Sequence, residues 1–245
     1  MVEIKRPTVV SKVQAPPPVV KLRKIEEGSK KGVTIVVYGP TGIGKTSLLR
    51  TAFPHYKPEE ILFVNIDAGE AVISDMTGIL VLDIGASTDL RLMKEMYREI
   101  VSKKLGFRLI FVDSISEQES YTLNIITNSR GKAFPTIKEQ GDASFKLREY
   151  LRLYRSLRDI GIDVVYCAQE KDIDIQNDST GIISKCVPCV SKKMVVDVCA
   201  MVDVIAHMEK DDKSEARWLR LESNDRFMAK KRYPWLDKFE KPSLS

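Results

Sequence analysis

Residues 39–46 read Gly-Pro-Thr-Gly-Ile-Gly-Lys-Thr, and this stretch decides the fold that we expect. It fits the pattern G-x-x-x-x-G-K-[ST] and directly follows an apolar run, Val33 to Tyr38. Ser47 to Arg50 then begin a helical pattern. A strand, a glycine-rich turn and a helix in this order form a P-loop, whose backbone N–H groups surround a phosphate chain. The sequence therefore predicts a nucleoside triphosphate site here.

The positions of this motif have distinct expected roles. Its glycines let the backbone approach phosphates closely, because no Cβ obstructs the turn. Lys45 is expected to reach the β and γ phosphates, and the Thr46 hydroxyl to ligate Mg²⁺. ATP and Mg²⁺ are thus the predicted cofactors. The residues expected to hold the nucleotide are Gly39, Pro40, Thr41, Gly42, Ile43, Gly44, Lys45, Thr46 and Ser47.

Carboxylates follow two further apolar runs. One run ends in Asp113, which is placed to hold Mg²⁺ through water. The next residue is Ser114 rather than Glu, so the group that positions the attacking water must come from elsewhere. The run over residues 61–66 leads to Asp67 and Glu70, and we expect it beside the P-loop strand, where ligands collect. Glu70 is the favoured base, Asp67 the alternative, and a purely structural role for both stays open.

A third run, Val164 to Cys167, leads to Gln169. This side chain is placed to sense the γ-phosphate by hydrogen bonding and to pass that signal to the following loop. A surface glutamine with no such role is the alternative.

The order of the apolar runs indicates the fold class. From residue 33 onward, short β-branched runs alternate with amphipathic helical patterns, which is typical of a parallel sheet covered by helices. Near the end, strand-like residues 202–208 and 218–221 flank a charged turn. We therefore predict an α/β fold with a mostly parallel sheet flanked by helices and a C-terminal β-hairpin.

The positive charge of the chain is concentrated in residues 1–31. This segment holds eight basic and three acidic side chains, a surplus equal to the whole chain's net charge of +5. It also contains Pro16-Pro17-Pro18 and no aromatic residue, so we expect a flexible arm with local polyproline II structure. Such an arm either meets nucleic acid or an acidic partner, or is a solvated leader.

Composition excludes several classes of protein. With 43% hydrophobic and 30% charged residues, the chain is neither collagen-like nor wholly disordered. No apolar stretch approaches a membrane span, so we expect no membrane contact and a cytoplasmic protein. Cys186 and Cys189 have metal-ligand spacing but lack a second such pair, which favours free thiols over a zinc site.

The order of the P-loop, the acid-bearing strand, the Asp113 strand and the Gln169 strand resembles the core of RecA-type ATPases. More narrowly, it resembles the phage-encoded P-loop nucleotide-binding proteins that include RecA-core single-strand annealing ATPases. The resemblance covers about residues 32–235. It implies a RecA-like ATPase domain over residues 32–245 after the arm, acting in the host cytoplasm if phage-encoded.

The segment from Arg226 to Pro234 resembles the Lys-x-Arg-aromatic motif of RecA-like ATPases of the bacterial RadA type. That resemblance implies that Lys230 and Arg232 reach the nucleotide of a neighbouring subunit, and hence a homo-oligomer. Cations in such positions stabilise the charge that spreads over the transferring phosphoryl oxygens. A solvated basic run is the alternative.

Two segments fall where RecA-type proteins carry DNA-contacting loops, residues 128–135 and residues 171–188, the latter with Lys185. Basic groups near an aromatic ring are what single-strand binding requires. The resemblance therefore implies single-stranded DNA as a partner, although ordinary surface loops would have the same composition.

These observations predict an ATPase that acts on single-stranded DNA in recombination, annealing or replication. One alternative is a P-loop kinase of a small substrate, for which an arginine-rich lid would be needed. Another is a nucleotide-dependent interaction or loader module without turnover, which engages a replication or recombination protein through the arm.

Overall fold

The computed structural model describes residues 31–85, 91–102, 105–177, 181–211 and 214–244. Apart from Lys31, the predicted arm lies outside these residues. The strands are β1 (Thr34–Gly39), β2 (Ile61–Asn65), β3 (Leu80–Asp83), β4 (Leu109–Asp113), β5 (Asp163–Asn177), β6 (Gly181–Pro188), β7 (Val204–Lys210), β8 (Arg217–Arg220), β9 (Lys230–Lys231) and β10 (Phe239–Glu240).

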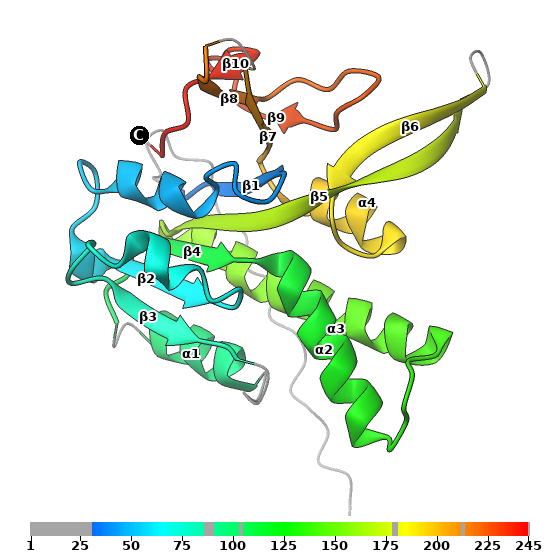
Figure 1. The fold of residues 1–245 in the computed structure, drawn as a ribbon. Helices are drawn as coiled ribbons and strands as arrows, with labels where there is room; N and C mark the ends of the chain where they lie inside the picture. The colour runs from blue at the N-terminus through cyan, green and yellow to red at the C-terminus, as the bar shows by residue number, and fades with distance from the viewer. Residues whose placement is uncertain (1–30, 86–90, 103–104, 178–180, 212–213, 245) are drawn as a thin grey trace, which may run out of the picture. The chain divides into compact units, whose positions relative to one another are not determined.

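The strands form a central sheet (Figure 1). Apolar side chains on both faces of its strands are buried. The strand order is β10-β8-β7-β1-β5-β4-β2-β3. Each pair from β7 to β3 is parallel, whereas β8 and β10 continue the sheet antiparallel. The α/β fold, the mostly parallel sheet and the C-terminal hairpin of β7 and β8 are therefore confirmed.

Successive side chains of a strand point to opposite sides of the sheet, so both faces carry apolar side chains that must be buried. Helices cover both faces and bury them. In β1, Val36 and Tyr38 belong to the core under the longer helices, whereas Val37 packs toward the P-loop side. The longer helices are α1 (Arg91–Val101), α2 (Ile115–Ser129), α3 (Ile137–Ser156) and α4 (Lys192–Met201). The short 3-10 helices are η1 (Thr46–Ala52), η2 (Pro58–Glu60), η3 (Gly69–Ile73) and η4 (Leu157–Ile160).

Side-chain caps set the starts of the two central helices. The Ser114 hydroxyl accepts a hydrogen bond from the backbone N–H of Glu117 at the start of α2. Thr136 and Glu139 form a reciprocal capping box at the start of α3. No helix in the part of the chain that the structure describes is long and apolar enough to cross a membrane.

The position of β2 differs from our expectation. We predicted that the second strand lies beside the P-loop strand, but β5 and β4 lie between β1 and β2. The prediction was wrong because strand order depends on crossover connections, which local sequence patterns do not encode. The carboxyl ends of these parallel strands still meet at one edge, where Gly39 pairs with Gln169 and Asn65 with Asp113.

The segment expected as a loop at residues 171–188 differs from that expectation where the structure describes it. Residues 171–177 of β5 and residues 181–188 of β6 pair as a two-stranded antiparallel ribbon, the β5–β6 ribbon (Figure 1). Ile173 and Ile175 alternate with acidic residues along this stretch. Such a period of two is typical of a β-strand, and its significance was missed.

Candidate active site

The P-loop follows β1 and ends in η1, as the motif predicts. Gly42 and Gly44 have φ angles of +78° and +105°, in the left-handed region that side chains rarely adopt. Between them Ile43 is buried, and its N–H donates a 3.4 Å hydrogen bond to the carbonyl of Pro40. The glycines therefore permit the turn, and Ile43 anchors it to the core.

Lys45 lies against the mouth of this loop. Its ammonium donates hydrogen bonds to the carbonyls of Gly39 at 2.9 Å and Pro40 at 2.8 Å. Burial lowers the pKa of Lys45, and nearby charges, among them those of Asp113 and Asp67, oppose that shift. The Lys45 cation is thus partly dehydrated and lies next to the P-loop turn, where it could bind a phosphate chain.

Thr46 and Asp113 form the centre of the predicted metal site. The Thr46 hydroxyl donates a 2.6 Å hydrogen bond to Oδ2 of Asp113, which is buried at the end of β4. Burial raises the pKa of Asp113 and Asp67 raises it further, while Thr46 and Lys45 lower it. A divalent cation would relieve this desolvated negative charge, and the hydroxyl and carboxylate oxygens are hard ligands of the kind that Mg²⁺ prefers. The donor set therefore fits Mg²⁺.

The segment after β2 closes over the pair of Thr46 and Asp113. The N–H groups of Ile66 and Asp67 donate to the Asp113 carbonyl at 2.7 and 3.1 Å. A Cβ at Gly69 would lie 3.1 Å from Asp113 Oδ2, so a larger residue there would require the carboxylate to shift by a few tenths of an ångström. A glycine outside the P-loop therefore lies in direct reach of the predicted metal ligands.

Glu70 and Asp67 both reach this edge but have different surroundings. Glu70 is exposed, and its carboxylate accepts a 3.3 Å hydrogen bond from Asn65 Nδ2, which also donates to Asp83 at 2.8 Å. The buried Asn65 Oδ1 receives no hydrogen bond from any group that the structure describes. Asp67 instead acts electrostatically on Asp113 and Lys45. The structure thus brings both predicted acids to the site without choosing between them.

Glu117 is an acid at this site that we did not predict. It lies in the first turn of α2, and burial followed by the charge of Asp67 raises its pKa. The pattern Ser114-x-x-Glu117 marks a helix start in the sequence. That signal, combined with the strand that ends at Asp113, would have placed Glu117 near the metal site.

Gln169 lies beside the P-loop and joins three elements, while its role as a sensor of the γ-phosphate stays a prediction. Its Oε1 accepts a 3.1 Å hydrogen bond from the Thr41 hydroxyl. Its N–H donates to Ser116 Oγ at 3.0 Å, and its carbonyl accepts from the N–H of Cys189 at 2.6 Å. A change at Thr41 can therefore reach α2 and the base of the β5–β6 ribbon through one residue.

Arg217, on β8, supplies a cation that sequence reasoning missed. A Cβ built on Gly44 would lie 3.5 Å from Arg217 Nε, so the guanidinium side of this residue approaches the P-loop backbone. Nothing in the local sequence around Arg217 indicates this position. It follows from the antiparallel pairing of β8 with β7, which itself lies beside β1.

Lys230 and Arg232 have partners inside the chain, at the opposite end of the parallel strands. Lys230 Nζ donates to the carbonyls of Cys199 and Val202, both at 2.7 Å, and burial lowers its pKa. Arg232 donates to Asp203 at 3.1 Å, and 43% of its side chain remains exposed. Their role in a neighbour's site stays a prediction.

The loop expected at residues 128–135 lies between α2 and α3, although residues 128 and 129 belong to the end of α2, and its cations are paired. Arg130 and Lys132 both bind Glu139, at 2.6 and 2.9 Å, and Arg130 also binds Asp142. Phe134 is 81% exposed. The pairing reduces the positive charge that this loop can offer to a nucleic acid backbone.

A comparison with protein families supports the P-loop interpretation. A family model described as AAA domain matches residues 31–233. Among solved structures, the chain is similar to a prototypical ATPase from the type III secretion system of pathogenic bacteria, with 13% identity and a TM-score of 0.48 over 73% of this chain and 52% of that one. It is also similar to the RadB recombinase, with 17% identity and a TM-score of 0.42 over 78% of this chain and 81% of that one. The chain thus spans about half the length of the secretion-system ATPase. No curated protein matches its sequence.

Proposed function

The chain belongs to the AAA domain family, and from that premise we propose that it is a Mg²⁺-dependent ATPase. One observation carries the proposal. The Thr46 hydroxyl and the buried Asp113 carboxylate meet at 2.6 Å, at the same strand edge as the Lys45 ammonium. A metal-ligand pair beside a phosphate-binding lysine is the arrangement that P-loop nucleotide hydrolysis requires.

Each residue has a role in this proposal. Lys45 and the loop backbone hold the β and γ phosphates, while Thr46 and Asp113 hold Mg²⁺. When bound, Mg²⁺ supplies positive charge that neutralises the phosphate oxygens as the bond to the γ-phosphate breaks. Gln169 contacts the P-loop through Thr41 and relays the nucleotide state to the β5–β6 ribbon.

We assign the water-positioning role to Glu70. Its carboxylate is exposed and is oriented by the neutral amide of Asn65, so it is available to accept a proton from an attacking water. Asp67 instead lies in the electrostatic environment of Lys45 and Asp113, which favours a role near the metal. On this assignment, Glu70→Gln loses turnover and retains ATP binding, whereas Asp67→Asn weakens the Mg²⁺ dependence.

Phosphate release from ATP tests the proposed activity. Wild-type protein should hydrolyse ATP only with Mg²⁺, and Lys45→Ala should lose that activity. Lys146→Ala is the matched control, because Lys146 is an exposed lysine on the surface of α3. Undiminished turnover in Lys45→Ala would refute the site. ATP binding without turnover in the wild type would instead indicate a nucleotide-dependent loader.

We further propose single-stranded DNA as the partner that stimulates turnover, in the recombination, annealing or replication role that the resemblance to phage proteins implies. The positive surplus of the chain lies in residues 1–31, whereas the cations Arg130 and Lys132 are paired with acids. Phosphate contacts by the arm would therefore supply most of the electrostatic attraction.

A salt series separates the arm from the rest of the chain. In the full-length protein, neutralising Lys5, Arg6 and Lys12 to Gln should make the salt dependence of binding to single-stranded DNA shallower by about 2 in log–log slope, at roughly 0.7 per lost contact. The matched control neutralises three exposed lysines outside residues 1–31, Lys138, Lys146 and Lys241. Equal slopes in the two triple variants would contradict a role for the arm.

We also retain the proposal that a second copy completes the site, now with Arg232 as the cation. Arg232 is partly exposed, whereas Lys230 is committed to two carbonyls near the end of α4. Mixing Lys45→Ala with Arg232→Ala tests this directly, because each variant lacks what the other supplies. Activity of the mixture above the sum of its parts supports a shared site. A purely additive result assigns Arg232 to internal structure alone.

A further inference from the structure

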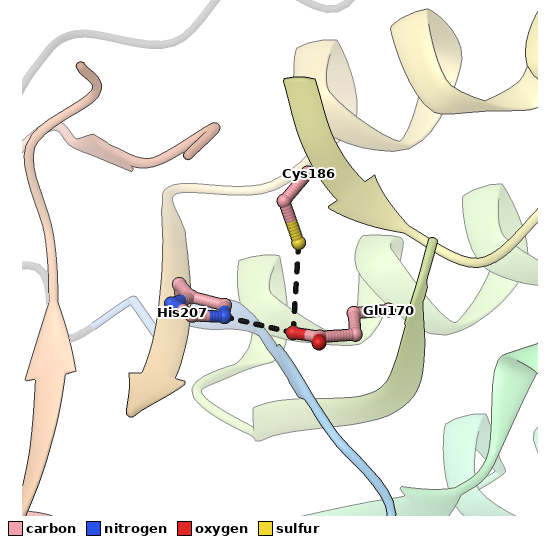
Figure 2. Close-up of side chains that lie close together, drawn as sticks. All are labelled: Glu170, Cys186 and His207. Carbon is pink, nitrogen blue, oxygen red and sulfur yellow. Dashed lines mark hydrogen bonds and ion pairs between the residues drawn. The ribbon is translucent and has the colours of Figure 1, made fainter. Parts of the chain in front are cut away.

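Three different ligand groups meet beside the nucleotide site but outside it. They are Glu170 on β5, Cys186 on β6 and His207 on β7, and Figure 2 shows the three side chains pointing toward one another. His207 Nε2 lies 2.9 Å from Glu170 Oε2, and Cys186 Sγ lies 3.5 Å from the same oxygen. The ligand atoms of the three residues all lie within 4.8 Å of one another.

The cluster is enclosed and its imidazole is held in place. Cys186 is 1% exposed and His207 is 3% exposed, whereas Glu170 keeps contact with solvent. The His207 ring stacks on Phe227 with centroids 4.2 Å apart, and the Tyr38 ring packs against it at 4.9 Å. The orientation of Nε2 toward Glu170 is therefore built into the core.

The surroundings of the other ring nitrogen of His207, Nδ1, also bear on what this cluster can bind. Among the residues that the structure describes, none forms a hydrogen bond with the buried Nδ1. Glu209 Oε2 lies 3.7 Å from this nitrogen, and Arg220 binds the same carboxylate. A histidine that gives one nitrogen to a metal usually donates its other N–H to a carboxylate, and Glu209 is placed for that role.

We propose that Glu170, Cys186 and His207 bind a divalent transition metal, with Zn²⁺ as the ion that fits this donor set. Imidazole, thiolate and carboxylate are all zinc ligands, and three protein ligands leave a fourth position for water, which solvent can reach on the Glu170 side. Bond lengths of about 2.0–2.3 Å place tetrahedral donors roughly 3–4 Å apart, so only small shifts are needed. On binding, the Cys186 thiol releases its proton to solvent.

The site would fasten the β5–β6 ribbon to the central sheet next to the P-loop. Its ligands come from three strands, and Glu170 directly follows Gln169, which contacts Thr41. This inference rests on the cluster itself and does not require the proposed ATPase activity. The expectation from the cysteine spacing was free thiols, and the proposed site differs from it in taking Cys186 as a ligand. Cys189 lies outside the cluster, and its N–H donates to the Gln169 carbonyl.

Cobalt binding to the full-length protein tests the site. Co²⁺ serves as a coloured probe, because a thiolate ligand gives it a charge-transfer band. The wild type and Cys189→Ser should show this band, and added Zn²⁺ should abolish it. Cys186→Ser should lose the band, and Glu170→Gln should weaken binding by at least about 100-fold, beyond the usual cost of losing an outer-shell partner. Cys189→Ser is the matched control, since it lies in the same C-x-x-C pair.

Thermal unfolding with and without Zn²⁺ gives a second readout. A ligand that binds only the folded state raises its stability, so Zn²⁺ should raise the Tm of the wild type and Cys189→Ser. It should leave the Tm of Glu170→Gln unchanged, and this variant decides the question if Cys186→Ser does not fold. Absence of the cobalt band in the wild type, or its loss in Cys189→Ser, would overturn the proposal.

Discussion

The Thr46 hydroxyl donates a 2.6 Å hydrogen bond to Asp113 Oδ2 and thereby joins the first turn after the P-loop to the end of β4. On the proposal that the two residues hold one Mg²⁺ ion, their contributions to turnover should not be independent. Thr46→Ala and Asp113→Asn should each lower turnover on the order of 100-fold or more, the scale of losing one stabilising group in a transition state. The double variant should be hardly worse than the single ones.

Steady-state ATP hydrolysis over a Mg²⁺ titration measures this coupling. Thr77→Ala is a suitable control, because Thr77 is an exposed threonine outside the site. Strictly multiplicative losses in the double variant would show that Thr46 and Asp113 act separately, against the shared-metal interpretation.

Gly69→Ala should reduce turnover without unfolding the protein. The added methyl group would lie 3.1 Å from Asp113 Oδ2 and 3.5 Å from Thr46 Oγ1, so it presses on the metal ligands from outside the P-loop. Misplacement of a reacting group by about 1 Å costs roughly 100-fold in rate, and this contact requires a shift of only a few tenths of an ångström, so we expect a loss of about several-fold. Gly106→Ala is the control, since a Cβ there meets nothing within 4 Å. Equal turnover in both variants would show that the ligands tolerate this contact.

Arg217→Ala should weaken catalysis through loss of a cation near the phosphates. The residue approaches Gly44 of the P-loop, so its charge is placed to attract the nucleotide. We expect kcat/KM for ATP to fall about 10-fold, equivalent to about 1.4 kcal/mol, with partial recovery in Arg217→Lys. Arg98→Ala, which removes an exposed arginine of α1, should have no effect. An unchanged kcat/KM in Arg217→Ala would show that Arg217 does not contribute to ATP binding or catalysis.

Asp203 should make the folded state sensitive to acid. It is buried and accepts hydrogen bonds from the Thr34 N–H at 3.0 Å and from Arg158 at 2.5 Å. Burial alone would raise the pKa of Asp203, but the hydrogen bonds from Thr34 and Arg158 outweigh it, and its pKa lies below the ordinary value. The unfolded state therefore binds the proton more readily. The stabilisation is present above about pH 4 and is lost as pH falls through the lower folded pKa.

Denaturant unfolding at several pH values checks this prediction. Asp203→Asn should lower the free energy of unfolding at pH 7 by about 3–5 kcal/mol, because it leaves the Arg158 cation uncompensated. Its stability should then fall less steeply than that of the wild type below about pH 4. Asp172→Asn breaks an exposed ion pair with Arg226 and should cost about 0–1 kcal/mol. If the free energy of unfolding of Asp203→Asn fell as steeply below about pH 4 as that of the wild type, Asp203 would not be the source of the acid sensitivity.

The sequence predicted those parts of the site that lie within one strand and the turn after it. The P-loop, Asp113 and Gln169 are each preceded by an apolar run, and the structure places all of them at one edge of the sheet. The pattern of the runs was sufficient because buried parallel strands leave few alternatives for where polar side chains at their ends can lie.

Other features depend on contacts between distant parts of the chain. Arg217 reaches Gly44, and Glu170 meets Cys186 and His207, only because the strands that carry them are neighbours. A local pattern indicates which residues form a strand but not which strand lies beside it. The misplacement of β2 has this cause.

By itself, the amino-acid sequence determined that this chain has a phosphate-binding turn after a buried strand, in an α/β sheet. The reason is that glycine spacing and apolar periodicity act through local backbone freedom and burial, which neighbouring residues control. Only the tertiary structure decided the strand order, the approach of Arg217, the internal partners of Lys230 and Arg232, and the cluster around Glu170. These depend on which distant segments pack together, and that choice is made by the free energy of the whole core.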